Sequence, residues 1–165
     1  MSQTRGVFFV HSAPSALLPH IEWAAAGAFG APCRFDWSVQ PAERGASRTE
    51  VAWCGPVGAS DQLASSLAGW RRIRFEVTEE ATRTSEAQRI SYTPTLGLFR
   101  ATVSMTGDIV VGEGRLKAAI EADALGLRPI HQALQDILGG PWDDELEPFR
   151  YAGDGAPVRW LHQVV

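Results

Sequence analysis

Three short segments in this chain of 165 residues alternate apolar and polar side chains with a period of two. The segments are residues 33–39, 48–53 and 72–78, centred on Trp37, Val51 and Phe75. Successive side chains of a β-strand point to opposite faces, so each segment predicts a strand with one buried and one polar face. Half-buried strands need a covering layer on one side, which favours a sheet packed against helices.

Two helical patterns and one further strand complete the order. Residues 6–11 form an apolar run typical of a central strand that is buried on both faces. Apolar residues three or four positions apart predict one helix over residues 17–29 and another over residues 60–70. The order strand, helix, strand, strand, helix, strand is the split βαβ pattern, and right-handed connections put both helices on one face. We therefore expect a ferredoxin-like βαββαβ sandwich.

The two faces of this sheet are expected to differ in chemistry. The face under the helices should hold the apolar strand positions, and with them the core residues Trp23, Trp37, Trp53 and Trp70. The opposite face should carry the polar strand positions Arg34, Asp36, Arg48, Glu50, Arg72, Arg74 and Glu76.

The second half of the chain adds weaker patterns. A short strand is predicted at residues 89–92, a β-hairpin at residues 98–104 and 109–111, and helices at residues 115–124 and 129–138. The resulting prediction is one α+β domain over residues 1–165. Its ferredoxin-like core covers residues 1–80, and an extension of a β-hairpin and two helices, residues 81–165, packs on that core. Residues 142–165 are irregular, with a final strand predicted at residues 158–164.

Composition excludes several classes of protein. The formal net charge of −4 argues against broad binding to nucleic acid or to anionic membranes. The sequence contains no apolar run of membrane-spanning length and no signal-peptide pattern, so we expect a cytoplasmic protein. No glycine-rich phosphate loop or metal-ligand spacing is present, and we expect no cofactor and no metal. Cys33 and Cys54 point to opposite sides of their predicted hairpin, which predicts two reduced thiols.

Few residues qualify as catalytic candidates. His11 and Ser12 lie where the first strand meets the first helix, a common place for sites in α/β folds, and histidine is the commonest general base. The alternative is that Ser12 caps the helix and His11 is packed or hydrogen-bonded. The acidic run of residues 143–147 has carboxylate oxygens for a metal but lacks EF-hand spacing, which favours a solvated helix start or turn.

Arginines suggest a binding surface. Arg72 and Arg74 belong to the densest basic cluster and should share a sheet face with Arg34. Arg150 and Trp160 lie in a C-terminal run of aromatics, arginines and glycines. Arginine binds carboxylate and phosphate bidentately, so these five residues suit an acidic protein partner. The alternative is that the basic cluster Arg71, Arg72 and Arg74 pairs with acidic residues across the strands or with the C-terminal acidic run; the acidic strand residues are Asp36, Glu50 and Glu76.

Several stretches resemble a known family. They are residues 11–14, 20–24, 67–70 and 76–80, and above all residues 142–162 with Glu145-Leu146-Glu147-Pro148-Phe149-Arg150-Tyr151-Ala152-Gly153. The chain resembles an actinobacterial family of uncharacterised proteins, the domain of unknown function 3145. The resemblance carries no catalytic residue. It implies a helper role near fatty-acid synthesis, in which arginines would dock an acidic carrier protein, although the residues themselves show nothing about lipids.

The first functional hypothesis is therefore a non-catalytic binding or regulatory module. The second is a small enzyme with a site centred on His11. The third is a homo-oligomeric structural protein that pairs through an exposed edge strand.

Overall fold

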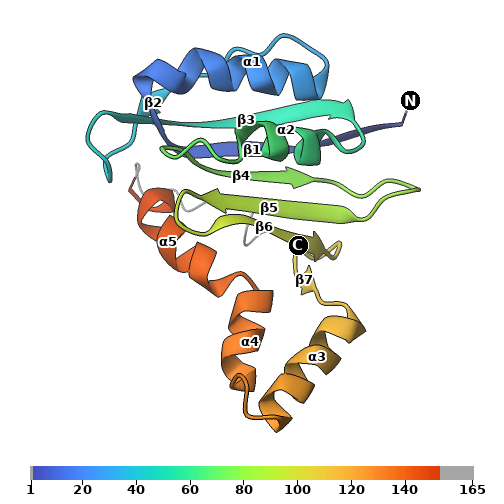
Figure 1. The fold of residues 1–165 in the computed structure, drawn as a ribbon. Helices are drawn as coiled ribbons and strands as arrows, with labels where there is room; N and C mark the ends of the chain where they lie inside the picture. Colours follow the sequence, from blue (N-terminus) through green and yellow to red (C-terminus); the bar gives the residue numbers. More distant parts are fainter. Residues whose placement is uncertain (1, 153–165) are drawn as a thin grey trace.

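The computed structural model describes residues 2–152, which contain one seven-stranded antiparallel sheet and five α-helices. The strand order across the sheet is β2-β3-β1-β4-β5-β6-β7 (Figure 1). The strands are β1 (Gln3–Pro14), β2 (Ser38–Val39), β3 (Ala46–Pro56), β4 (Arg74–Glu79), β5 (Ala87–Thr93), β6 (Gly97–Val103) and β7 (Ile109–Val110). The predicted hairpin is confirmed, since Ser38 pairs with Arg48 across the loop between β2 and β3.

The helices lie on both faces of the sheet. They are α1 (Leu18–Phe29), α2 (Ala59–Leu67), α3 (Glu113–Ala124), α4 (Ile130–Ile137) and α5 (Gly140–Arg150). Figure 1 shows α1 and α2 together on one face, as predicted, and α5 on the opposite face near one end of the sheet. Helices α3 and α4 form a hairpin that projects below the sheet edge. None of the helices in residues 2–152 has the length and hydropathy needed to cross a membrane.

The main core lies between the sheet and the helices α1 and α2. Phe8 at the centre of β1 pairs with Val51 on one side and Val77 on the other, which puts all three side chains on the helix-covered face. The Phe8 ring makes edge contacts with Phe29 of α1 and Phe75 of β4. Val51, Phe75 and the partly buried Trp37 all belong to this one core, as their two-residue period predicts.

Two predictions for this region are wrong, namely the burial of Trp23 and the strand over residues 33–37. Trp23 is 79% exposed, because it lies two residues after the buried Ile21 and therefore about 200° around the helix from it. Residues 33–37 form no strand, and Val39 in the two-residue strand β2 is 76% exposed. Phe35 is nevertheless buried and packs on Phe8, so the segment contributes to the core without pairing in the sheet.

The second half of the chain extends the sheet. Strand β5 pairs with β4, then β6 and β7 follow, which confirms the predicted strand and hairpin but places them in the same sheet as β1. A four-stranded sandwich would end at β4, so the seven-strand order does not confirm the ferredoxin-like topology. The predicted helices correspond to α3 and α4. Helix α5 was not predicted, and the strand predicted at residues 158–164 lies outside the described residues.

Candidate functional site

Strand β1 carries a bulge at the catalytic candidate His11. Toward β3 the pairing moves from Val10 directly to Ala13, and toward β4 it moves from Val10 to Ser12. A bulge adds an unpaired residue and turns the neighbouring side chains. The His11 ring stacks on Phe9 with 5.7 Å between the centroids, and it meets Glu76 of β4 on the face opposite α1 and α2.

Glu76 is the centre of a buried polar cluster. Its carboxylate lies 2.6 Å from His11 Nε2 and 3.0 Å from the Ser91 hydroxyl, and it accepts two hydrogen bonds from Arg150 at 3.0 and 2.5 Å. Arg150 also donates to Asp143, two helical turns earlier in α5, at 2.9 Å. We call these five residues the Glu76 cluster. The cluster residues belong to β1, β4, β5 and α5, so their hydrogen bonds hold α5 against the middle of the sheet.

Electrostatics keep this carboxylate ionised. Burial acts to raise the pKa of Glu76, but the hydrogen bond and charge of His11, together with the charge and hydrogen bonds of Arg150, hold that pKa well below its usual range. An ionised carboxylate only accepts hydrogen bonds, so His11 Nε2 must donate to it. The other ring nitrogen, Nδ1, has no hydrogen-bond partner among the described residues.

A second set of contacts joins the same end of the sheet to α5. Gln40 is buried and donates to the backbone carbonyls of His11 and Phe149, at 2.5 and 3.1 Å. The Arg74 guanidinium lies 4.3 Å from the Phe149 ring centroid and donates to Glu43 at 3.2 Å. These contacts cover one end of the sheet face that the alternation alone predicts to be open and polar.

The side chains of His11 and Ser12 each hydrogen-bond to a different carboxylate, Glu76 and Glu43. His11 is 1% exposed, and it lines neither the cavity over the sheet at Val7 and Arg89 nor the smaller one beside Gln3 and Cys54. Ser12 does not cap the following helix, since its hydroxyl donates to Glu43. A nucleophile and its base need mutual hydrogen bonding and access for a substrate, and no hydrogen bond joins His11 to Ser12 within residues 2–152. His20 is exposed on α1, away from this cluster.

The structure describes four of the five predicted binding residues. Arg34 and Arg72 are both exposed. Arg74 is partly buried against Phe149, and Arg150 is 7% exposed within the Glu76 cluster. Trp160 lies outside the described residues. The alternative predicted for the basic cluster was pairing with acidic residues across the strands or in the C-terminal acidic run, but the acidic partner of Arg74 is Glu43. Arg150 pairs with Glu76 and with Asp143.

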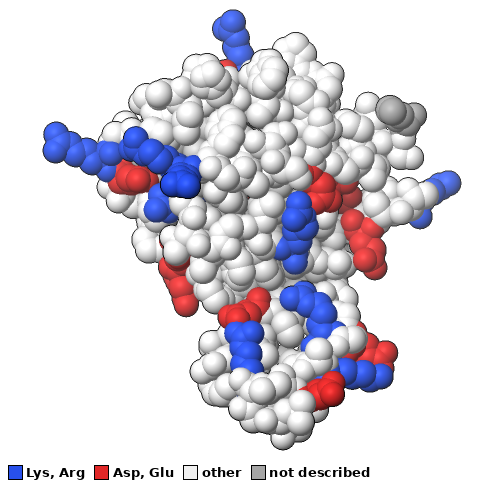
Figure 2. Space-filling view, in the orientation of Figure 1, with Lys and Arg blue, Asp and Glu red and all other residues white. Residues whose placement is uncertain are grey.

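A basic edge lies where β1 ends and β4 begins. The loop before β3 carries Arg44, and the turn before β4 carries Arg71 and Arg72; all three side chains are exposed and make no ion pair within the described chain. The ion pair between Glu43 and Arg74 ties the loop to the start of β4. We call Arg44, Arg71, Arg72 and Arg74 the arginine edge. In Figure 2 basic side chains gather on the left of the upper part, where Figure 1 shows the loop between β2 and β3.

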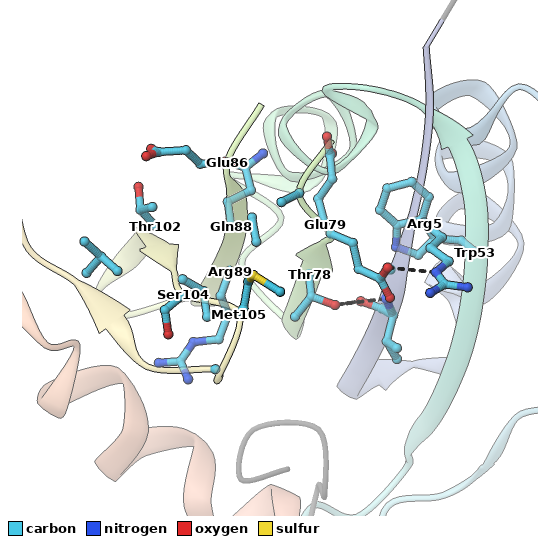
Figure 3. A pocket seen from close by; sticks show the side chains of 18 of the residues that line it. Arg5, Trp53, Thr78, Glu79, Glu86, Gln88, Arg89, Thr102, Ser104 and Met105 are labelled. Carbon is cyan, nitrogen blue, oxygen red and sulfur yellow. Dashed lines mark hydrogen bonds and ion pairs between the residues drawn. The ribbon is translucent and has the colours of Figure 1, made fainter. Parts of the chain in front are cut away.

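The open half of the sheet face, beyond α5, forms a groove. A cavity of about 880 Å³ lies over five neighbouring strands (Figure 3). Its floor contains one residue from each of β3, β1, β4, β5 and β6: Ala52, Val7, Thr78, Arg89 and Val103. The sequence pattern does not predict this groove, because nothing in the alternation of β4 indicates that β5 and β6 continue the sheet.

The remaining predictions concern metals and thiols. No group of three metal-ligating side chains is present in residues 2–152, and the acidic run of residues 143–147 is part of α5. Cys33 and Cys54 are free thiols, as predicted. Burial, together with the charge of Glu22, raises the pKa of the Cys33 thiol, which lowers its reactivity.

The buried partners of Glu76 were also missed. Glu76 was assigned to the polar face, which is correct, but Ser91 and Asp143 carried no signal that they would meet it. One sequence feature indicated that the region of α5 matters: the stretch around Arg150 resembles a known family, although its pattern predicts no clear secondary structure.

Comparisons with known proteins give a family and no activity. Searches of curated proteins and of solved structures found no match to this chain. One family model, described as a protein of unknown function (DUF3145), matches residues 7–163, which include the β1 bulge and all of α5. The chain therefore belongs to the DUF3145 family.

Proposed function

We propose that this chain is a non-catalytic binding module that docks an acidic protein partner on the arginine edge. The observation that carries the proposal is the gathering of Arg44, Arg71 and Arg72 at one end of the sheet, exposed and without ion pairs among the described residues. The protein as a whole is acidic, with a net charge of −4, so this edge is a local exception. Complementary charge steers association and fixes orientation.

Arginine suits such a surface. Its planar guanidinium binds carboxylates bidentately and is weakly hydrated, which lowers the cost of covering it with a partner. Arg74 helps to position the arginine edge, because its contacts with Glu43 and Phe149 hold the start of β4 in place. An association with fatty-acid synthesis, with an acidic carrier protein as the partner, rests on the family resemblance alone.

Charge reversal tests this proposal. The tagged full-length chain is used to recover proteins from its native cell, and the recovered proteins are compared with those of Arg44→Glu/Arg72→Glu. We expect the double variant to lose acidic partners that the wild type retains, and added salt to weaken their recovery. The matched control is Arg83→Glu, because Arg83 is also exposed but lies in the loop after β4. Retention of every wild-type partner by the double variant would count against the arginine edge.

A second candidate, self-association, is favoured by the α3–α4 hairpin. Its own small core consists of Ala119, Ala133 and Ile137. Large apolar side chains on the hairpin remain exposed, namely Leu116, Ile120, Leu125, Leu127 and Leu138. Exposed apolar groups of this size mark interaction surfaces when they are contiguous. The edge strands β2 and β7 have two residues each, so edge-to-edge pairing has little backbone to use.

Solution mass decides whether this second candidate holds. We expect a concentration-dependent dimer that Ile120→Glu abolishes, while Val39→Glu on the edge strand β2 leaves it intact. A monomeric mass at all protein concentrations would contradict self-association.

We also infer that residues 1–165 fold as one domain, and that residues 1–80 retain the ferredoxin-like βαββαβ pattern. The first four strands follow the order β2-β3-β1-β4, and both crossover helices share one face, which supports this reading. The pairing of β4 with β5 supports a single cooperative unit, which one coincident unfolding transition by two spectroscopic probes would test.

A further inference from the structure

We propose that the groove on the open half of the sheet face binds a small amphiphile that has an aliphatic body and one anionic group, with the anionic group at Arg89. This site is separate from the arginine edge, so it does not depend on the proposed partner. The cavity of about 880 Å³ lies within the volume range of small-molecule sites, roughly 300 to 1,000 Å³.

The groove walls are chemically suited to an aliphatic body. Val7 and Ala52 face each other across β1 and β3, and Val103 and Met105 lie on the opposite side of the groove. Met105 is largely exposed at the end of β6, and methionine adapts its shape to apolar ligands. Burial of apolar surface here would contribute roughly 25 cal/mol per Å² before the costs of association.

Arg89 is the feature that selects an anion. It lies on the groove floor beside Thr78, its pairing partner in β4. Its Nε is buried and has no hydrogen-bond partner among the described residues. A guanidinium that is partly shielded from water and has no counter-ion is costly, so an anionic ligand group that pairs with its accessible end is favoured.

The other charged residues of the groove have partners or lie apart. Arg5 is paired with Glu80 at 2.7 Å. Glu79 accepts hydrogen bonds from the backbone of Gly58 and Ser60 at the start of α2. Figure 3 shows the Glu86 carboxylate at the upper left and the Arg89 guanidinium at the lower left, where the two groups point away from each other. Arg89 is therefore the cation that remains for a ligand in the described part of the groove.

Fluorescence titration of the full-length chain with dansyl-undecanoic acid tests the proposal, with its neutral methyl ester as the second probe. We expect saturable binding of the acid, and at least about tenfold weaker binding of the ester, the loss expected for one charge-assisted hydrogen bond. Arg89→Gln should lower the affinity for the acid to that for the ester, and it should leave the affinity for the ester unchanged. Arg83→Gln, outside the groove, should change neither probe.

Blocking the groove gives an independent test. Ala52→Trp fills the floor with a side chain that starts from an exposed position, and it should abolish binding of both probes. Glu50→Trp lies two residues earlier on the same strand face, outside the groove, and should bind like the wild type. Absence of saturable binding to the full chain would overturn the proposal. So would equal affinity for acid and ester, or binding only by a chain ended at Ala152, which would assign the groove to residues 153–165.

Discussion

His11 Nε2 lies 2.6 Å from a carboxylate oxygen of Glu76, and both side chains are almost completely buried in the middle of the sheet face. A histidine beside a carboxylate is often part of a catalytic site. Here the second carboxylate oxygen accepts hydrogen bonds from Arg150 and Ser91, which joins the pair to α5 and β5. The arrangement holds α5 against β1, β4 and β5.

Removal of the Glu76 charge should destabilise the protein strongly. In Glu76→Gln, Arg150 remains buried without its main counter-ion, and breaking one side of a buried ion pair costs about 3–5 kcal/mol. Urea unfolding should show this loss in the free energy of unfolding. Glu50→Gln is the control, because Glu50 is exposed on β3, two strands away, and its loss should change stability by less than about 0.5 kcal/mol. Equal stability of the two variants would contradict a fastening role for Glu76.

Acid should weaken the same contacts. The folded state lowers the pKa of Glu76, whereas a glutamate in an unfolded chain has a pKa of about 4.3. The unfolded state therefore binds the proton first, so the contribution of Glu76 is complete above about pH 4.3 and is lost as the pH falls below that value. Between about pH 6 and pH 3, unfolding free energies should fall more steeply for the wild type than for Glu76→Gln. Parallel pH profiles would show that Glu76 titrates normally.

Arg150 should control the attachment of α5. Arg150→Met keeps much of the side-chain volume but removes both the pair with Glu76 and the pair with Asp143. Amide hydrogen exchange in residues 140–150 should then become faster, with smaller changes in α1 and α2. Arg128→Met removes an exposed ion pair with Asp136 and should leave exchange in α5 unchanged. If α5 exchanged equally slowly in both variants, its docking would not depend on Arg150.

Gly6 is required by a close backbone approach between β1 and β4. A Cβ at this position would lie 1.9 Å from the Thr78 carbonyl oxygen. Gly6→Ala should therefore destabilise the protein by about 1–3 kcal/mol or more, the range for overpacking. Gly27 lies within α1, and a Cβ there would have no neighbouring atom within 4 Å, so Gly27→Ala should stabilise by about 0.5–1 kcal/mol. Thermal unfolding of both variants measures the difference, and a change of the same sign in both would contradict it.

Local periodicity was enough to predict the faces of β3 and β4. Val51 and Phe75 alternate with polar residues, and this pattern depends only on the geometry of a strand. The same alternation was misleading for residues 33–37, where Phe35 is buried but the backbone makes no strand pairing. Burial alone produces the pattern there, without the hydrogen bonding of a sheet.

The candidate sites were much harder to predict, because they depend on elements far apart in the sequence. Because Phe75 and Val77 face the core, Glu76 between them must lie on the opposite face of the sheet. Whether that face meets solvent or α5 depends on Arg150, which lies 74 positions later in the sequence. Helix α5 itself begins after Gly139 and contains Pro148, so its sequence resembles a loop. The groove likewise exists only because β5 and β6 extend the sheet.

The most direct test of the proposed function compares the arginine edge with the Glu76 cluster in one experiment. The wild type, His11→Gln and Arg44→Glu/Arg72→Glu are each used, below their unfolding temperatures, to recover partners from the native cell. The proposal predicts that His11→Gln is less stable but recovers the wild-type partners, whereas the arginine variant is as stable as the wild type and loses the acidic ones. Loss of partners from folded His11→Gln, with retention by the arginine variant, would contradict it.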